Sequence, residues 1–191
     1  MRDKKGRNIM SLKPWKVLVE EDVSPSKWFP LFRHEVELSN GRVVKDYYVS
    51  KLGDFAIIVA LTDTAEVMMV RQYKHGAGEV ILELPAGGID NDSPETAAIR
   101  ELAEETGVIA DSCTLLGTLV PDTAKGTARM HAYLVHHAVI QATQSLDDNE
   151  EIEVVCVPLA EISGKISRGE ITSLPTIAAL TLARIKEGVE W

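Results

Sequence analysis

Short runs in which hydrophobic and polar residues alternate dominate the first third of the chain, and this periodicity is typical of β-strands. The clearest runs flank Asn40-Gly41 in FRHEVELSNGRVVKDYYV. Because that dipeptide readily takes positive φ angles, it predicts a two-residue hairpin turn. A second hairpin is predicted between residues 55–61 and 66–73, joined by the polar segment TDTA. Further strands are predicted over 114–120, 128–139 and 151–157.

One helix has well-marked ends, at residues 93–106. Ser93 can cap its N-terminus, Pro94 suits the first helical position, and Gly107 suits a left-handed C-terminal cap. The sequence therefore predicts that this helix begins and ends at defined residues.

Two more helices are expected near the C-terminus. An amphipathic pattern predicts one from about residue 175 to residue 186, and residues 159–171 are expected to form a short helix broken near Gly164. Strands, a central helix, further strands and terminal helices are typical of an α+β fold with a mixed sheet. We expect the hairpin around Asn40-Gly41 to be an N-terminal antiparallel extension of that fold.

Length and charge limit the function classes. The 191 residues suit one domain, or one domain with a small appendage. We expect a flexible tail over 1–14, an N-terminal β-strand region over 15–50 and the main domain over 51–191. The 20 basic and 29 acidic side chains give a net charge of −9, so we expect no nucleic-acid partner.

Other features concern the compartment. The N-terminus does not resemble a signal peptide, and no apolar run approaches the roughly 18 residues of a membrane span. We therefore expect a cytoplasmic protein with no membrane partner. Cys113 and Cys156 lie in apolar surroundings without metal-ligand spacing, which predicts two reduced core thiols.

Three carboxylates are the first candidates for chemistry. Glu101, Glu104 and Glu105 stand at positions i, i+3 and i+4, so they share one face of the predicted helix and repel one another. Hard oxygen donors on a rigid surface suit Mg²⁺ or Mn²⁺. Taken alone, such a run is more often a solvated surface. The preceding LPAGG turn, whose glycines let backbone approach a ligand closely, favours a site.

The segment Arg100–Val108, RELAEETGV, resembles the REUxEExGU core of the Nudix box. The flanking residues 83–87, ELPAG, and residues 71–73, RQY, resemble the nucleoside-diphosphate-sugar branch of the Nudix hydrolases, particularly ADP-ribose pyrophosphatases. The resemblance implies an α/β/α Nudix sandwich that hydrolyses nucleoside diphosphates linked to a further group, using a divalent metal.

The resemblance also implies a metal-ligand set. It adds the backbone carbonyl of Ala86 to the three glutamates, around two or three cations that would neutralise both the helix and the substrate diphosphate. The chain departs from the family where Asp92 replaces the first glutamate of the box, whose family role is to orient the box arginine. We expect Arg100 to pair with Glu104 instead.

A general base is expected outside the helix, in the acidic stretch 147–153. Alignment with the family's strand makes Glu150 the best match for the catalytic glutamate, with Asp148 second. A solvated acidic loop is the alternative. Arg71 and Lys74 could hold the distal phosphate, although surface salt bridges would explain them almost as well.

The N-terminal region suggests a partner. In this branch an aromatic residue stacks on the purine, sometimes from the other subunit, which makes Trp28 and Phe29 candidates, with a core position as the alternative. Since a two-stranded hairpin is marginal alone, we expect residues 15–50 to form a homodimer. A hairpin folded onto its own chain in a monomer is the alternative.

The expected activity is metal-dependent hydrolysis of ADP-ribose or a related nucleoside diphosphate sugar, releasing a nucleoside monophosphate and a sugar phosphate. ELPAG and RQY occur in enzymes with different sugar preferences, so the preferred substrate stays open. The alternative is a catalytically silent Nudix domain that binds a nucleotide as a sensor or interaction module. The intact box glutamates favour the enzyme, because a silent domain would gain nothing from keeping a self-repelling cluster.

Overall fold

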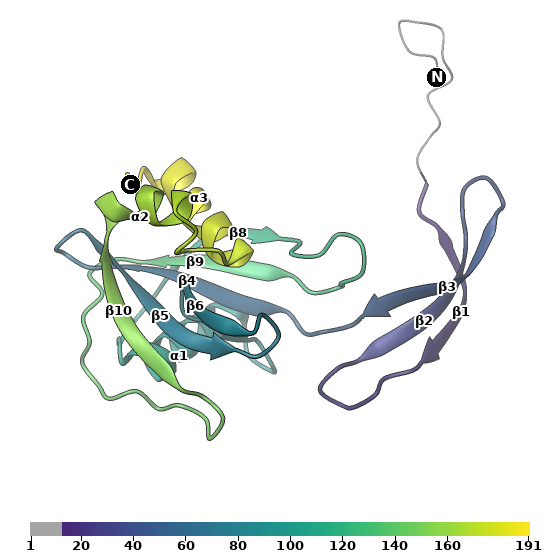
Figure 1. Ribbon diagram of the computed structural model, residues 1–191, viewed down its shortest axis with the longest axis horizontal. Coiled ribbons are helices and arrows are strands. Elements are labelled where there is room, and N and C mark those ends of the chain that lie inside the picture. The colour runs from purple at the N-terminus through teal and green to yellow at the C-terminus, as the bar shows by residue number, and fades with distance from the viewer. Residues whose placement is uncertain (1–12) are drawn as a thin grey trace, which may run out of the picture. The chain divides into compact units, whose positions relative to one another are not determined.

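The computed structural model describes residues 13–191, which form two compact units. The first contains residues 13–52 and 122–127, and the second contains residues 53–121 and 128–191. Figure 1 labels their elements. The tail predicted over 1–14 lies outside the described residues except for its last two positions.

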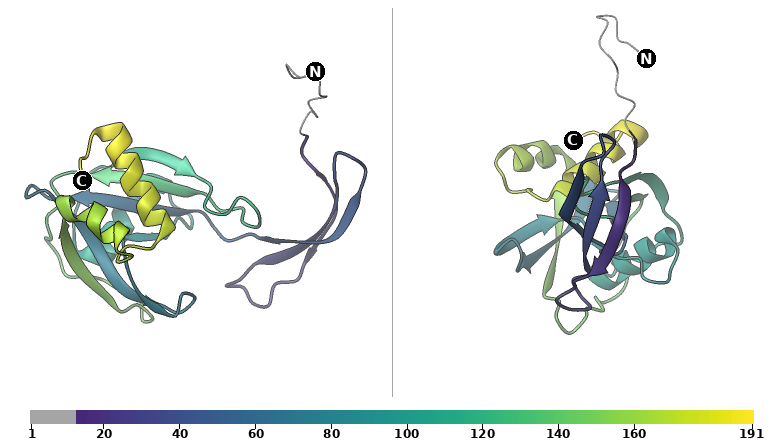
Figure 2. Two further views of the ribbon diagram at one scale, coloured as in Figure 1. Left: turned by 45° about the horizontal axis from the view of Figure 1, so that its top comes forward. Right: turned by 90° about the vertical axis from the view of Figure 1, so that its right-hand side faces the viewer.

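The first unit is a three-stranded antiparallel sheet. Its strands are β1 (Lys16–Asp22), β2 (Leu31–Glu37) and β3 (Val43–Ser50), in the order β1-β2-β3. They lie side by side in the right-hand view of Figure 2. The predicted N-terminal hairpin is confirmed as β2-β3, and β1 adds a strand that the hydrophobic pattern did not single out.

The turn of this hairpin differs from the prediction. Leu38 N donates to Arg42 O (2.9 Å) and Gly41 N donates to Leu38 O (2.9 Å), so the connection is wider than two residues. The Asn40 Oδ1 atom accepts from Arg42 N (3.0 Å), and of the Asn40-Gly41 pair only Gly41 takes a positive φ, 82°. The Asn40 side chain therefore stabilises a local turn in which one left-handed residue suffices.

A distant segment, residues 122–127, completes the first unit. Ser50 N donates to Lys125 O (2.7 Å), and Thr127 N donates to Ser50 O (3.1 Å). The Lys125 ammonium lies 3.9 Å from the centre of the Tyr47 ring, an attractive cation–π distance. These contacts attach the loop after β8 to strand β3.

The second unit is built on a mixed sheet with the central order β10-β5-β4-β9-β8, to which β6 adds beside β5 and β7 beside β4. β4 and β9 are parallel, and the other pairs are antiparallel. The strands are β4 (Phe55–Leu61), β5 (Glu66–Lys74), β6 (Glu79–Glu83), β7 (Ala86–Gly88), β8 (Thr114–Leu119), β9 (Met130–Val135) and β10 (Ile152–Pro158). The predicted mixed sheet is confirmed.

Helices cover both faces of this sheet. Alternate residues of β4 point to opposite sides: Ile57 packs in one buried cluster with Leu180 of α3 (Leu174–Glu187), and Ile58 packs in another with Leu102 of α1 (Pro94–Thr106). The helix α2 (Leu159–Ser167) joins α3 through Ile162. Figure 1 shows α2 and α3 on one side of the sheet and α1 on the other. The layers are therefore α/β/α.

Two predicted boundaries need correction. The α2 helix runs through Gly164 without a break, because a single glycine costs a helix only about 1 kcal/mol and Ile162, which is fully buried, anchors this helix in the core. The strand predicted over 128–139 is shorter, Met130–Val135. It ends at Val135, two residues before His137, whose φ of 55° lies outside the β region.

Both described cysteines carry free thiols, as predicted, but only Cys113 is partly buried, and Cys156 is exposed on the edge strand β10. The prediction of a core position is therefore wrong for Cys156. Within residues 13–191, no helix is both long and apolar enough to cross a membrane.

Candidate active site

The acidic face predicted on the central helix forms on α1. Ser93 accepts a hydrogen bond from Thr96 N (3.1 Å), and Gly107 ends the helix with a φ of 75° while its N–H donates to Ala103 O (2.8 Å). Both predicted caps are confirmed. The apolar side of α1 packs against the sheet through Leu102, and Glu105, one turn further on, is buried beside it.

Glu105 is a buried carboxylate, with 3% of its surface exposed. Its Oε2 atom accepts a hydrogen bond from the backbone nitrogen of Ala86 (3.0 Å). Burial raises the pKa of Glu105 to about 8; the Ala86 hydrogen bond and the Lys74 charge oppose this rise, and the charges of Glu101 and Glu150 add to it. A positive charge bound here would therefore be strongly stabilised.

Glu101 lies against the backbone of β7. A Cβ atom on Gly87 would stand 2.1 Å from the Glu101 Cδ atom, so only glycine permits this approach. Burial raises the pKa of Glu101, and the charges of Glu104 and Glu150 raise it further against the opposing effect of Arg100. The LPAGG turn thus places Ala86 against Glu105 and Gly87 against Glu101.

Arg100 links this cluster. Its Nη1 atom lies 2.8 Å from a carboxylate oxygen of Glu101 and 2.8 Å from one of Glu104, and its Nη2 atom donates to Gly88 O (2.9 Å). Burial disfavours the guanidinium charge, yet Glu101 and Glu104 hold the pKa of Arg100 above its ordinary value. The predicted pairing with Glu104 is confirmed. Asp92 also contacts Arg100, with its Oδ2 atom 3.3 Å from Nε.

The donor chemistry fits a divalent cation. Two of the box carboxylates, Glu101 and Glu105, are shielded from water and repel each other, which a cation between them would relieve. Across residues 13–191, no three acidic, histidine or cysteine side chains converge in metal-binding geometry, and the Arg100 guanidinium contacts both Glu101 and Glu104. Binding a metal would therefore require the Arg100 side chain or the carboxylates to shift.

The acidic loop before β10 brings a further carboxylate near the helix. The charge of Glu150 raises the pKa of both Glu101 and Glu105, so its side chain lies within electrostatic range of both. Glu150 N donates to Asp147 O (2.9 Å), and Asp147 N donates to Glu150 Oε2 (3.1 Å), which makes a self-contained turn. Asp148 stands exposed in the same turn.

The two predicted phosphate-binding cations both have acidic partners. Arg71 Nη1 lies 2.9 Å from Glu153 Oε2, and Lys74 Nζ lies 3.0 Å from Glu83 Oε1. The salt-bridge alternative thus describes their present contacts. Lys74 also acts on the buried Glu105, whose pKa it lowers, so it is close to the acidic cluster.

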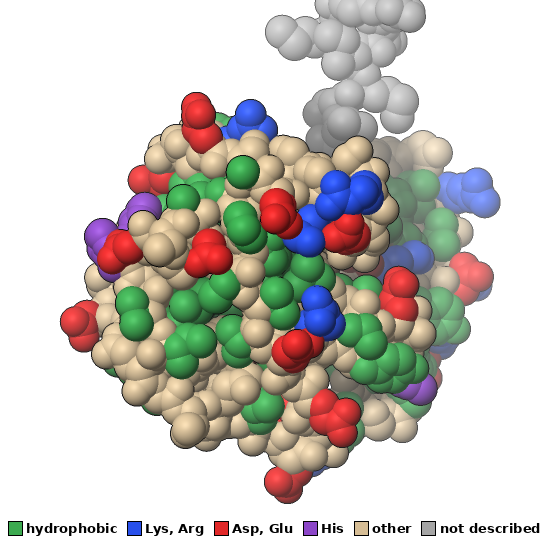
Figure 3. All heavy atoms as spheres, turned by 60° about the vertical axis from the view of Figure 1, so that its left-hand side comes forward, with side chains coloured by type: hydrophobic (Ala, Val, Ile, Leu, Met, Phe, Trp, Pro, Cys, Tyr) green, Lys and Arg blue, Asp and Glu red, His purple; other side chains and the backbone are tan. Residues whose placement is uncertain are grey.

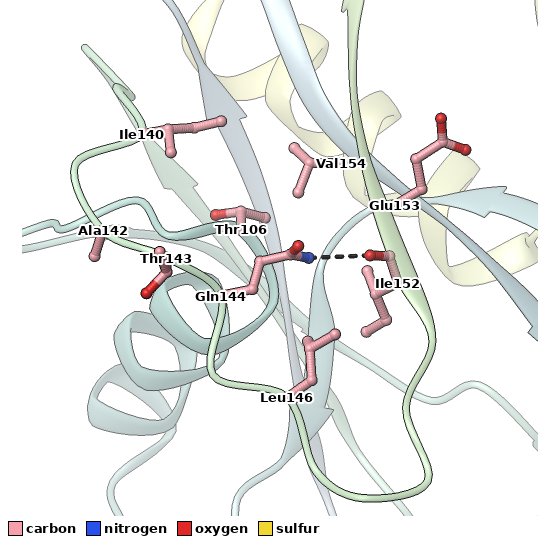
Figure 4. A pocket seen from close by; sticks show the side chains of 9 residues that line it. All are labelled: Thr106, Ile140, Ala142, Thr143, Gln144, Leu146, Ile152, Glu153 and Val154. Carbon is pink, nitrogen blue, oxygen red and sulfur yellow. Dashed lines mark hydrogen bonds between the residues drawn. The ribbon is translucent and has the colours of Figure 1, made fainter.

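Two pockets flank the start of β10. One, of about 840 Å³, lies beneath the loop that leads to β10 (Figure 4). The other, of about 640 Å³, includes Arg71 and Tyr73. Leu146, Ile152 and Glu153 line both. Apolar side chains gather between scattered acidic and basic ones on the face drawn in Figure 3.

Trp28 and Phe29 belong to the first unit and are exposed, at 78% and 47%. The Lys27 ammonium lies 4.4 Å from the Trp28 ring centre. The core alternative is therefore wrong for both residues within this chain, and their role in stacking on a purine stays a prediction.

Sequence reasoning missed one residue of the site region, Gln144. Its side chain joins the end of α1 to the start of β10, with Nε2 2.7 Å from Glu105 O and 3.2 Å from Ile152 O. Nothing in the polar segment QATQS distinguishes it from Gln141, because the signal lies in the fold rather than in the sequence.

Known proteins resemble this chain in sequence and in overall fold. The family described as NUDIX domain matches residues 53–180, and the nucleoside diphosphate sugar hydrolase N-terminal domain matches residues 15–50. A crystal structure of an ADP compounds hydrolase resembles the chain with a TM-score of 0.81 at 26% identity, covering 92% of this chain and 95% of that one.

The similarity to two relatives covers nearly the whole length of each relative. The ADP-ribose pyrophosphatase of Bacillus subtilis is 29% identical over 177 residues, covering 92% of this chain and 95% of that protein. The GDP-mannose pyrophosphatase of Yersinia enterocolitica is 30% identical over 179 residues, covering 87% and 94%. With the box helix, the glycine turn and the α/β/α layers in place, these matches show that the chain belongs to the Nudix hydrolase family, with the N-terminal domain of nucleoside diphosphate sugar hydrolases.

Proposed function

We propose that this Nudix hydrolase cleaves the diphosphate bond of ADP-ribose or a related nucleoside diphosphate sugar, giving a nucleoside monophosphate and a sugar phosphate. Relatives named as ADP-ribose and GDP-mannose pyrophosphatases support this substrate class. The observation that carries the proposal is the pair of shielded carboxylates on α1, Glu101 and Glu105, with the loop carboxylate of Glu150 in electrostatic range of both.

In this proposal Glu101, Glu104, Glu105 and the main-chain carbonyl of Ala86 hold two or three Mg²⁺ or Mn²⁺ ions. Such cations supply Lewis acidity and neutralise the charge that develops on the diphosphate. The position of the Ala86 nitrogen, 3.0 Å from Glu105 Oε2, supports this ligand set because it orients one buried carboxylate beside the β7 backbone.

Glu150 is the proposed general base. It accepts a proton from the attacking water, whose oxygen forms a bond to one phosphorus while the bond from that phosphorus to the bridging oxygen breaks. The second phosphate leaves with the bridging oxygen. The electrostatic effect of Glu150 on two box glutamates supports this role, and Asp148 in the same turn is the second candidate.

Arg71 and Lys74 are proposed to bind the phosphate farther from the box. Both now pair with carboxylates of neighbouring strands, and a substrate diphosphate, which carries two negative charges, offers a stronger partner for either cation. Arg71 lines the 640 Å³ pocket with the exposed ring of Tyr73, which supports a ligand on that side.

A homodimer is proposed through the first unit, in a protein that we expect in the cytoplasm. All of β1 is exposed, including Val17 and Val19, and so is Trp15 just before it. A sheet with this much uncovered apolar surface is typical of an interface. Trp28 and Phe29 are proposed to stack on the substrate base.

The test is incubation of the purified chain with ADP-ribose, ADP-glucose and GDP-mannose, each with Mg²⁺, Mn²⁺ or a chelator, followed by chromatography of the nucleotides. We expect metal-dependent release of the monophosphate from at least one. A silent nucleotide-binding domain would instead bind without turnover, and Glu105→Gln supplies the matched inactive control.

A further inference from the structure

The loop that leads to β10 is attached to the C-terminal end of the box helix. Gln141 N and Ala142 N donate to Gly107 O (2.9 and 3.0 Å), and Ser145 N donates to Glu104 O (2.9 Å). The last carbonyls of a helix have no partner within the helix, so these donors satisfy groups that would otherwise need water. The loop therefore completes the C-terminal cap of α1 that Gly107 begins.

One side chain of this loop makes two connections. The Gln144 Nε2 atom lies 2.7 Å from Glu105 O, in the last turn of α1, and 3.2 Å from Ile152 O, the first residue of β10. Figure 4 shows the side chain reaching across to Ile152. Because an amide nitrogen has two protons, one group can satisfy both carbonyls.

Packing does not hold the loop at this point. The pocket of about 840 Å³ lies between the loop and strand β10, and residues 141–145 are exposed. Gly107 allows the loop backbone to approach closely, since a Cβ there would stand 2.1 Å from Ala142 O. Hydrogen bonds, rather than buried side chains, therefore set the position of the loop.

The segment that Gln144 closes is the one that carries Glu150. Gln144 bonds Ile152 across residues 145–151, so both ends of the segment meet at one amide, which is also attached to α1. Within it, the turn between Asp147 and Glu150 is held by two reciprocal hydrogen bonds. These hydrogen bonds restrict how far the Glu150 carboxylate can move relative to the Gln144 amide.

We propose that Gln144 is a positioning residue for hydrolysis: its amide ties both ends of the acidic turn to the box helix and so fixes the Glu150 carboxylate relative to Glu101 and Glu105. This inference rests on the proposed function, in which Glu150 is the base. Gln144 contacts neither substrate nor metal in this account. It acts by holding the Glu150 carboxylate in position, because a small displacement of a general base slows proton transfer.

The test compares Gln144→Met, which keeps the length of the side chain but removes both donors, with Gln141→Met in the same loop. Gln141 makes one long side-chain contact, 3.5 Å to Ile109 O, and none to β10. We expect Gln144→Met to lower kcat about ten-fold with KM within about two-fold, and Gln141→Met to leave both unchanged.

A double-mutant cycle separates positioning from a general loss of structure. If Gln144 acts through Glu150, the Gln144→Met effect on kcat disappears in the Glu150→Gln background. An equal fold-loss in both backgrounds, or a kcat of Gln144→Met equal to that of the wild type, overturns the proposal.

Hydrogen exchange in the metal-free protein gives a readout that needs no activity. The Ser145 amide should exchange about ten-fold faster in Gln144→Met than in the wild type, and at an unchanged rate in Gln141→Met. If the wild type hydrolyses no nucleotide sugar, the proposed function has failed. The hydrogen-exchange rates then test on their own whether the Gln144 amide anchors the loop to α1. Unchanged Ser145 exchange then overturns it.

Discussion

The backbone nitrogen of Ala86 donates a hydrogen bond of 3.0 Å to the buried carboxylate of Glu105, and so joins the glycine turn to the box helix. One donor does not offset the burial of this group, whose pKa is raised to about 8. An ionisable carboxyl buried where its charged form is disfavoured is explained if the site holds a cation, which would favour that charged form.

Glu105→Gln should lower kcat at least about 10²-fold, because it removes a charged metal ligand. The metal-free variant should be more stable than the wild type. A carboxyl whose folded-state pKa is raised favours folding only while it is protonated. The free energy of unfolding of the wild type should therefore fall as pH rises from about 4.5 toward 8. The gain in Tm should therefore be larger at pH 8 than at pH 5, by thermal unfolding with a chelator.

The matched control for that measurement is Glu104→Gln on the same helix face, where the carboxylate is half-exposed and paired with Arg100. It should show no comparable pH-dependent gain. Activity of Glu105→Gln within a few-fold of wild type would reject Glu105 as a metal ligand.

Gly87→Ala should displace the Glu101 carboxylate, since the new methyl group would stand 2.1 Å from the Glu101 Cδ atom. We expect kcat/KM to fall at least about ten-fold and the free energy of unfolding to fall by about 1–3 kcal/mol. Gly88→Ala is the control, because its nearest neighbour would be Asp90 Oδ1 at 3.7 Å. Equal behaviour of the two variants would show that the close approach is unimportant.

Much of this site could be predicted from the sequence because its signals are local. The caps Ser93 and Gly107 and the spacing of the glutamates act within one helix, and they fold as expected. The Gln144 connection could not be predicted, since it depends on how the loop meets β10. The two-residue turn predicted from Asn40-Gly41 was wrong for a related reason. The Asn40 side chain accepts a hydrogen bond from Arg42 N and so stabilises a wider turn than the dipeptide alone suggests.

Glu150→Gln should depress kcat far more than substrate affinity, because proton removal matters only on the way to the transition state. The drop should be about 10²-fold in steady-state assays, with binding measured separately by calorimetry. Glu151→Gln, the exposed neighbour, should behave as wild type. If Glu150→Gln leaves kcat nearly unchanged while Asp148→Asn or Glu153→Gln lowers kcat about 10²-fold, the base has been assigned to the wrong residue.

The first unit should mediate self-association. Light scattering at micromolar concentration should give about twice the 20.9 kDa of one chain, because β1 and its neighbours leave apolar side chains uncovered.

Trp28→Ala should raise KM with little change in kcat if the ring stacks on the substrate base. A monomeric mass would defeat the dimer, and an unchanged KM would remove Trp28 from the binding site.

The most direct test of the central claim is a phosphorus NMR time course of the wild type and Glu105→Gln with the best nucleotide sugar. With the wild type and diamagnetic Mg²⁺, we predict that the diphosphate signals give way to two phosphomonoester signals in equal amounts. Chelator or Glu105→Gln should leave the diphosphate intact. Binding of nucleotide sugars by the wild type with metal, but no phosphomonoester over hours, would contradict the account.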